Sequence, residues 1–395
     1  MWRPYHRGVD DRAEPSRRIR SGRVVGRVLG IPLYLNASML VLAVLVTVVY
    51  GGYVQGSLDL PGPVSYLIGF GFVLCLLGSV LLHELGHALT ARRFGIGVRG
   101  ITLELLGGYT EMDREAPSPR VDALVALAGP AVSLVLGGAS ALVYQLLPDR
   151  TVAGEIAFQL AASNILVAFF NVLPGLPLDG GRALRALVWA IVRDRTRATV
   201  VAGWAGRVIA VATAGGTVVL YRLGFVTLFG MLFILLVVVT LWQGAGQSIR
   251  LARMTSRFPL VDLGALARPV LGVPSGTPLA EAERRGVEDA RDRPALGVED
   301  SSGRLVALVD VAAAAKVPAD RRPWVPVDSV ARDVGKLTAL KADLTGEQVV
   351  KAIQAYPGAQ YLVVSGEDVV GVLHVADLAA VLEPPRTVAQ AKERS

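Results

Sequence analysis

Cysteine, histidine and charged residues are scarce in this chain. It has one cysteine, Cys75, and four histidines among 395 residues, and only 18% of the residues are charged. A single cysteine excludes a disulfide framework. The 52% of hydrophobic residues and a mean hydropathy of +0.49 are instead typical of a membrane protein with a soluble part. The hydrophobic residues are concentrated before Gly246, and the remainder has the mixed composition of a soluble domain.

Six apolar runs are long enough to cross a bilayer, which requires about 20 residues. They predict an α-helical polytopic membrane protein with a basic arm at 1–30, six transmembrane helices within 31–250, a soluble α/β domain at 258–383 and a disordered tail at 384–395. The runs are Tyr34–Val54, Pro61–Leu82, Ala123–Leu147, Ile156–Leu178, Val201–Tyr221 and Leu223–Gly246.

Arginines are distributed unequally between the two sides of these spans. Eight precede the first span and five lie in each of the segments after the second and fourth spans, whereas the other side has only Arg150 and Arg222. Basic loops stay in the cytoplasm, so we expect a multi-pass protein of the cell membrane with both termini and the soluble domain cytoplasmic. The net charge of +7 then reflects membrane topology, and no nucleic-acid partner is expected.

The sequence His83-Glu84-Leu85-Gly86-His87 directly follows a run without charge from Pro61 to Leu82. Two histidines four residues apart on a helix share one face, so both imidazoles can reach a single Zn²⁺. The glutamate between them can take a proton from a zinc-activated water. A lone histidine on an apolar helix is usually a core residue, but ionisable residues at membrane depth favour a functional interpretation.

Zinc in a hydrolase takes three protein ligands, so a third one is needed. His6 and His374 lie in the arm and in the soluble domain, which leaves a carboxylate. Asp179 is the best candidate, because it follows the uncharged fourth span at the predicted depth of the histidine pair. The alternatives are that Asp179 caps a helix predicted at 182–192, or that the ligand comes from a polar loop, from Glu104, Glu111 or Asp113.

His83-Glu84-x-x-His87 on one span and Asn171-x-x-Pro174-x-x-Pro177-x-Asp179-Gly180 on a later one resemble the site-2 protease family of intramembrane zinc metalloproteases. The resemblance is strong over residues 20–250 and extends to the prokaryotic branch with CBS domains, which includes the sporulation pro-sigma-factor protease. It implies that His83, His87 and Asp179 bind zinc and that Glu84 is the catalytic base. It also implies that Asn171 contacts the oxyanion or, with Pro174, the substrate.

Residues 101–110 alternate between apolar and polar side chains and contain Gly107 and Gly108, which predicts a strand that ends in a turn. Exposed strand edges accept extended peptides through backbone hydrogen bonds. The resemblance implies that this small membrane-associated β segment, with Gly107 and Gly108, holds an unwound substrate. A simple hairpin in a loop is the alternative.

Residues 258–383 contain two repeats of similar length. Each predicts a strand, a helix and a β-hairpin, an order that resembles a CBS pair with an adenine nucleotide between the repeats. The ribose-binding pattern of such pairs maps weakly onto Gly371 to Asp377, because His374 stands where the family has Thr or Ser. Dimerisation or substrate docking is therefore an equal alternative to nucleotide binding. The predicted elements are Val270–Pro274, Pro278–Arg285, Ala295–Val298 and Leu305–Val309, then Trp324–Val327, Gly346–Tyr356, Tyr361–Val364 and Val369–Leu373.

Together these features predict a zinc metalloendopeptidase that hydrolyses a peptide bond in or near a transmembrane segment of a membrane-anchored protein, in regulated intramembrane proteolysis. The resemblance implies an anti-sigma or pro-sigma factor as substrate, contact with membrane lipid, and a homodimer or higher oligomer through the CBS pair. The alternatives are a non-catalytic zinc-binding membrane adaptor and a CBS-regulated membrane transporter. No half-to-half repeat supports a transporter, and Glu84 would have no purpose in one.

Overall fold

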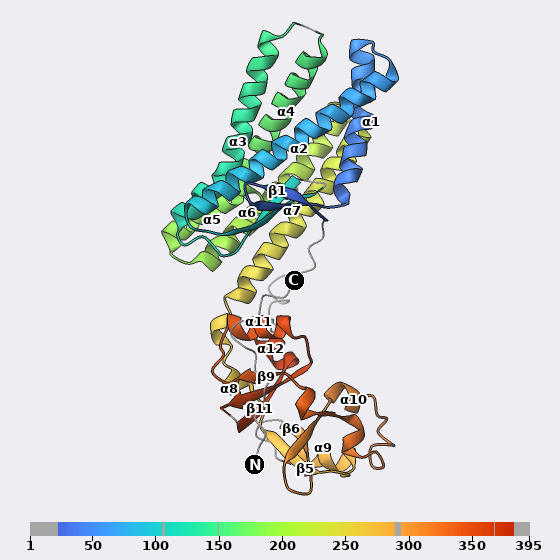
Figure 1. Cartoon of the computed structure of the whole chain (residues 1–395), viewed down its shortest axis with the longest axis vertical. Coiled ribbons are helices and arrows are strands. Elements are labelled where there is room, and N and C mark those ends of the chain that lie inside the picture. The colour runs from blue at the N-terminus through green and yellow to red at the C-terminus, as the bar shows by residue number, and fades with distance from the viewer. Residues whose placement is uncertain (1–22, 105–106, 149, 289–293, 367, 383–395) are drawn as a thin grey trace. The chain divides into compact units, whose positions relative to one another are not determined.

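The computed structural model describes residues 23–104, 107–148, 150–288, 294–366 and 368–382. The chain forms two compact units that meet in sequence at Arg253 and Met254 (Figure 1). The first unit is a helical bundle with one small sheet, and the second contains two α/β repeats. Most of the predicted basic arm and the predicted tail lie outside the described residues.

The described part of the first unit contains six helices long and apolar enough to cross a membrane, which confirms the predicted number of spans. A further helix, α5, is shorter and lies between the fourth and fifth spans. Exposed leucine, valine and phenylalanine side chains cover the outer faces of the six spans, as expected where lipid is the solvent. The helices are α1 (Ser38–Leu58), α2 (Gly62–Arg93), α3 (Pro119–Leu146), α4 (Val152–Val172), α5 (Asp179–Val192), α6 (Arg195–Arg222) and α7 (Leu228–Thr255).

Local sequence signals determine where several of these helices begin. The side chains of Ser118, Thr151 and Asp194 each accept a hydrogen bond from the backbone amide three residues later, and so cap α3, α4 and α6. Helices α2 and α3 also carry proline in the first turn, where a missing amide hydrogen has no cost to the helix.

The first and fourth spans are shorter than predicted at the side that we expect to be cytoplasmic. The first begins at Ser38 and not at Tyr34, because Ile31–Leu35 is paired as a strand. The fourth ends at Val172 and not at Leu178. The intervening prolines prevent helix formation there, so the expected broken turn is a non-helical segment of six residues, 173–178.

The sixth span also differs, because α7 is shifted towards the C-terminus relative to the predicted Leu223–Gly246. Gly224 adopts a φ of +79° in the turn before it, a conformation that favours glycine. Arg250 and Arg253, which mark the predicted membrane exit, are therefore part of the last turns of α7.

A four-stranded sheet covers part of α2 in the first unit. Its order is β1-β2-β3-β4, with an antiparallel, a parallel and an antiparallel pairing. Its buried side chains, including Ile101 and Leu103, pack against Leu85 and Ala88 of α2. The strands are β1 (Arg23–Val28), β2 (Ile31–Leu35), β3 (Val98–Glu104) and β4 (Gly107–Met112).

The sheet corrects two expectations. The end of the basic arm forms the β1–β2 hairpin, which turns through Leu29 and Gly30 with φ angles of +51° and +78°. The predicted strand is present as β3, but Gly107 and Gly108 begin the next strand, β4, and do not end the first one. The predicted alternation at 101–110 therefore covers two antiparallel strands.

The second unit repeats one arrangement twice, a strand, a helix and two antiparallel strands. Its sheets have the orders β5-β6-β7-β8 and β11-β10-β9. In each repeat the first strand pairs in parallel with the strand after the helix. The strands are β5 (Val270–Pro274), β6 (Ala295–Glu299), β7 (Leu305–Val309), β8 (Ala331–Asp333), β9 (Ala339–Lys341), β10 (Gln360–Ser365) and β11 (Asp368–His374). The helices are α8 (Leu263–Leu266), α9 (Leu279–Glu288), α10 (Val311–Ala315), α11 (Glu347–Ala355) and α12 (Val375–Leu382).

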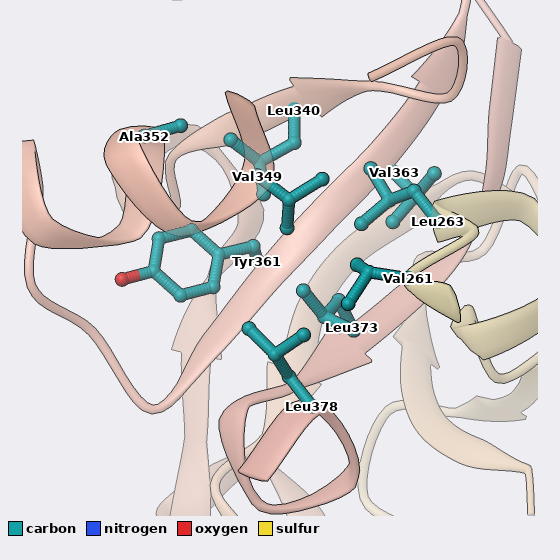
Figure 2. Packing of buried hydrophobic residues seen from close by; sticks show 9 residues of the cluster. All are labelled: Val261, Leu263, Leu340, Val349, Ala352, Tyr361, Val363, Leu373 and Leu378. Atoms are coloured by element: carbon teal, nitrogen blue, oxygen red, sulfur yellow. The ribbon is translucent and has the colours of Figure 1, made fainter. Parts of the chain in front are cut away.

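Seven of the eight elements predicted for the two repeats are confirmed within a few residues. The predicted strand Trp324–Val327 is wrong, because the chain there forms turns and a 3₁₀-helix at Val327–Val330. The first strand of the second repeat is β9, whose three residues are too few to give an alternating pattern. Figure 2 shows the core of the second repeat, where Tyr361 and Leu373 pack against Val349 and Leu378.

Candidate metal centre

Helices α2 and α5 bring together three side chains that are far apart in sequence. His83 and His87 lie one turn apart on α2, and Asp179 is the first residue of α5. Oδ2 of Asp179 lies 3.2 Å from Nε2 of His83 and 3.2 Å from Nε2 of His87. The two Nε2 atoms are also 3.2 Å apart. Both histidines are buried, with 5% and 3% of their surface exposed.

This arrangement fits a tetrahedral zinc ion. Bonds of about 2.1 Å to nitrogen and oxygen, at tetrahedral angles, place neighbouring ligand atoms about 3.4 Å apart. All three distances of 3.2 Å are close to this value. Two imidazole nitrogens and one carboxylate are a donor set that zinc prefers, and they leave a fourth position for water or substrate.

The second nitrogen of each histidine is held by α3. Nδ1 of His87 lies 2.7 Å from the backbone oxygen of Val125, which can only accept a hydrogen bond. Nδ1 of His87 therefore carries the proton, and Nε2 keeps a free electron pair for a metal. Nδ1 of His83 lies 2.8 Å from the hydroxyl of Ser133, which can accept a hydrogen bond in the same way. These contacts fix both rings with Nε2 directed at Asp179.

Gly129 of α3 lies directly over the histidine pair. A Cβ atom at this position would lie 2.6 Å from Nε2 of His83 and closer still to Nε2 of His87. Gly86 has the same role on the opposite helix, because a Cβ there would lie 2.9 Å from the backbone oxygen of Ala128. Helices α2 and α3 can therefore approach closely only because both positions are glycine.

A buried ion pair connects α3 to the helix that carries Asp179. Asp122 is 1% exposed and accepts hydrogen bonds from Arg185 of α5, with Nε at 2.9 Å and Nη2 at 2.7 Å. Arg182, one turn from Asp179, lies 3.6 Å from the same carboxylate. A bidentate pair of this kind restricts rotation and sliding of α5 against α3. It therefore helps to determine where the Asp179 carboxylate lies.

The segment before Asp179 packs closely against glycine positions of α6 and α7. The amide of Leu176 donates to the backbone oxygen of Ala202 in α6 at 3.0 Å. The Cα of Gly206 faces the backbone of Leu176, and Gly244 of α7 faces the ring of Pro177. Because any larger residue at the two glycines would collide with this segment, α6 and α7 form a close-fitting support for the chain that leads to Asp179.

Glu84 is held beside this group by the sheet. It is 5% exposed, and the hydroxyl of Thr110 in β4 lies 2.8 Å from its Oε2. Gly108, two residues earlier, faces the same side chain, since a Cβ there would lie 2.8 Å from Cγ and 3.1 Å from Oε1 of Glu84. Gly107 has a φ of +139°, which favours glycine. The two predicted glycines are thus at the edge strand that contacts Glu84.

The remaining predicted residues of the membrane unit are less closely placed. Asn171 is half-buried in the last turn of α4, and Pro174 is exposed in the segment that follows. Among the described residues, no hydrogen bond joins Asn171 to His83, His87 or Asp179. The proposed contacts of Asn171 and Pro174 with substrate stay predictions.

In the second unit, one of the two predicted nucleotide-binding residues, Asp377, is engaged by another side chain of the protein. Asp377 accepts two hydrogen bonds from Arg268, at 2.7 and 2.6 Å. A Cβ on Gly371 would lie 2.6 Å from the backbone oxygen of Arg268. His374 is buried, and its Nε2 has no partner among the described residues. Burial and the positive charge of Arg268 lower the pKa of His374.

Sequence reasoning missed the residues that support the centre, namely Thr110, Asp122, Gly129 and Ser133. Of these, Asp122 had a visible signal, because it is an acidic residue at the very start of the third apolar run. A charge at that place is usually solvated, so only the structure reveals that it is buried against α5.

Comparisons with known proteins find relatives that cover most of the chain. The model of peptidase family M50 matches residues 71–160 and 150–215. The chain is 31% identical over 369 residues to sll0528 of Synechocystis sp., covering 91% of this chain and 95% of that protein. It is 31% identical over 386 residues to Rip3 of Mycobacterium tuberculosis, with coverages of 92% and 94%. Both relatives are described as zinc metalloproteases.

Solved structures also match parts of the chain. The site-2 protease from Methanocaldococcus jannaschii is 25% identical, with a TM-score of 0.42, and the match covers 58% of this chain and 95% of that one. Two solved CBS-domain proteins, from Thermoplasma acidophilum and Agrobacterium tumefaciens, also match, with TM-scores of 0.25 and 0.23.

Proposed function

The chain belongs to peptidase family M50, the site-2 proteases, and on that premise we propose that His83, His87 and Asp179 bind its zinc ion and that Glu84 is its general base. One observation carries this assignment. Three possible ligand atoms, two from α2 and one from α5, lie 3.2 Å from one another, and the helix of the two histidines also carries the buried Glu84. Each residue type also has the chemistry that its role needs.

The proposed reaction is hydrolysis of a peptide bond in a membrane-anchored protein. When bound, zinc polarises the scissile carbonyl and lowers the pKa of a water. Glu84 accepts the proton of the attacking water and transfers it to the leaving amine. Thr110 donates to Oε2 and so orients the carboxylate, with Oε1 beside Gly108. Asn171 is the proposed donor to the developing oxyanion.

We propose that the substrate binds as an added strand on β4. Among the described strands, β4 pairs only with β3, so its other edge is available for backbone hydrogen bonds. A helical substrate must unwind to expose its peptide bond, and an edge strand stabilises the extended form. Gly107 and Gly108 lack side chains that would keep this backbone away from Glu84.

The proposed substrate is a single-span or hairpin membrane protein, with an anti-sigma or pro-sigma factor as the class that the family resemblance favours. The arginine distribution supports cytoplasmic termini and a cytoplasmic CBS pair. The His motif then lies near the cytoplasmic end of α2, so cleavage would release a product on that side and serve regulated intramembrane proteolysis.

For the CBS pair we propose assembly or substrate docking in preference to nucleotide binding at Asp377. A ribose that bound Asp377 would have to displace the two hydrogen bonds from Arg268. His374 cannot supply the small hydroxyl group of the ribose-binding pattern. Size-exclusion chromatography with light scattering tests the proposed oligomer, and ATP or AMP binding by the wild-type chain would contradict this preference.

The variant Glu84→Gln tests the proposed function. Glutamine keeps an oxygen that can accept from Thr110 but cannot take a proton. We expect wild-type zinc content and thermal stability, with cleavage of a reconstituted single-span substrate reduced by about 10²–10⁴-fold. Wild-type cleavage by this variant would refute the role of Glu84.

Two further measurements make this test specific. His83→Ala and Asp179→Ala should each lose stoichiometric zinc in a metal assay, which would connect α2 and α5 to one centre. Glu104→Gln is the matched control, because Glu104 is a rival carboxylate that instead accepts from Asn36 at 3.2 Å. Loss of zinc in that control, or its retention in Asp179→Ala, would contradict the proposed ligand set.

A further inference from the structure

Arg207 is a charged residue within the membrane-spanning helix α6, about three turns from its start. Among the described residues it forms no ion pair and no hydrogen bond. Its Nε is buried without an acceptor. Its guanidinium carbon instead lies 4.7 Å from the ring centre of Trp204 and 4.9 Å from that of Trp242 in α7.

The two indole rings satisfy only part of this guanidinium. Aromatic rings attract a cation through their faces. The five N–H donors of arginine lie in the guanidinium plane, and they need acceptors at its edge. Ionisable groups at membrane depth are normally paired with an opposite charge or with backbone oxygens. An anionic acceptor at the edge of Arg207 would complete the site.

The surroundings of Arg207 face lipid. Trp204 and Trp242 are 46% and 44% exposed on the outer surface of the helices. Tryptophan and arginine are the side chains that gather at the boundary between lipid tails and headgroups. A helical side chain leans towards the N-terminus of its helix. For Arg207 this is the end at Arg195, where α6 leaves the membrane.

Helix α7 contacts Arg207 and carries a second arginine nearby in sequence. A Cβ on Gly246 would lie 3.2 Å from Nη2 of Arg207, so this glycine makes room for the guanidinium group beside α7. Arg250 follows one turn later on the same face of α7 and is exposed. It also has no ion pair among the described residues. Exposed valines, Val208, Val211 and Val239, continue along both helices towards the membrane interior.

We propose that Arg207 binds the phosphate of an anionic phospholipid headgroup beside Trp204 of α6 and Trp242 of α7, with Arg250 as a second cation. The exposed valines would contact the acyl chains. A lipid fits better than free phosphate because the two tryptophans beside Arg207 are exposed on membrane-spanning helices. A lipid of net negative charge fits better than a zwitterionic one because two guanidinium groups would otherwise meet a neighbouring ammonium group. The end of α6 at Arg195 places this lipid in the cytoplasmic leaflet, and only this choice of leaflet rests on the proposed topology.

Bound lipid would also stabilise the support of the metal centre. Gly206, next to Arg207, contacts Leu176. Gly244, two residues before Gly246 on α7, contacts Pro177. A headgroup that holds α6 and α7 together would keep this support for Asp179 closed. The lipid requirement can nevertheless be measured without any proteolysis.

Native mass spectrometry of the full chain, released from detergent with added lipid, tests the proposal. We expect phosphatidylglycerol to bind at least tenfold more tightly than phosphatidylcholine. Arg207→Gln should remove this preference, and Arg207→Lys should retain part of it. Arg222→Gln is the matched control, because Arg222 is exposed at the opposite end of the same helix. Thermal unfolding should show the same phosphatidylglycerol-dependent stabilisation in the wild type and in this control.

Three results would overturn the proposal. One is equal phosphatidylglycerol binding by the wild type and Arg207→Gln. Another is competition by inorganic phosphate at concentrations similar to the lipid, which would assign the site to a free anion. The third is lipid binding that is unchanged in Arg207→Gln, together with weaker capture of a membrane-anchored substrate by Glu84→Gln/Arg207→Gln than by Glu84→Gln. That result would assign Arg207 to substrate binding. If Arg207→Gln does not fold, Arg250→Gln supplies the test, and unchanged lipid preference in it counts against the proposed lipid site.

Discussion

Gly129→Ala should abolish zinc binding while leaving the helix that carries it intact. The added methyl carbon would lie 2.6 Å from Nε2 of His83, whereas an ordinary contact begins at 3.4 Å. One of the groups must therefore move by at least 0.8 Å (3.4 − 2.6), and the contact with His87 is tighter still. Both imidazoles are fixed through Nδ1, so they cannot turn aside without losing those hydrogen bonds.

The expected loss of zinc affinity is at least 100-fold. Removing a group that only orients a metal ligand costs about 10- to 100-fold, and a methyl group among the ligand atoms should cost more. A factor of 100 corresponds to about 2.8 kcal/mol. In contrast, alanine is a better helix former than glycine by up to about 1 kcal/mol. The substitution should therefore harm the centre and not the helical structure.

Zinc content after dialysis against buffered zinc, with circular dichroism in parallel, measures both effects. Gly138→Ala is the matched control, because a Cβ at Gly138 of the same helix meets nothing within 4 Å. We expect this control to bind zinc like the wild type. Wild-type zinc affinity in Gly129→Ala would refute the proposed position of the ion between the two histidines.

Three further predictions follow from the supporting contacts. Asp122→Asn leaves Arg185 without its buried carboxylate, so it should lower stability by about 3–5 kcal/mol in thermal or denaturant unfolding and weaken zinc binding. Thr110→Val removes a hydrogen bond to a charged group worth about 1.5–3 kcal/mol, so kcat should fall about 10- to 100-fold at unchanged zinc content, with Thr110→Ser close to wild type. Burial and Arg268 lower the pKa of His374, so the stabilisation by the neutral imidazole is complete above about pH 6.5 and is lost as the pH falls below that value. His374→Phe should reduce this pH dependence of stability in unfolding experiments on the full chain.

The parts of the structure that were predictable from sequence are those determined by local periodicity and length. The six spans follow from runs of about 20 apolar residues. The pairing of His83 with His87 follows from helical spacing, and Asp179 follows from the need for a third ligand at the same depth. The prolines before Asp179 also correctly indicate a break in the fourth span.

The parts that were not predictable depend on pairing between distant segments. Strands β1 and β2 are short, and their turn at Leu29 and Gly30 is not one of the strong two-residue turn signals. The parallel pairing of β2 with β3 brings together segments separated by α1 and α2, which no local pattern reveals. For the same reason, the occupation of Asp377 by Arg268 could not be foreseen.

Helix α3 organises the proposed metal centre although it supplies none of the three proposed ligands. Asp122 holds α5, Val125 and Ser133 hold the two imidazoles, and Gly129 provides the room between them. These four positions are three, four and four residues apart, so they form one stripe along a single face of the helix. A stripe that includes an acid, a glycine and a serine in an otherwise apolar span is a pattern that sequence alone contains. Its meaning depends on where α2 and α5 lie, because the same small and polar residues would also suit ordinary helix packing in a membrane. The function of α3 is therefore to set the distance between α2 and α5, and any change that separates these helices should reduce zinc affinity before it unfolds the bundle.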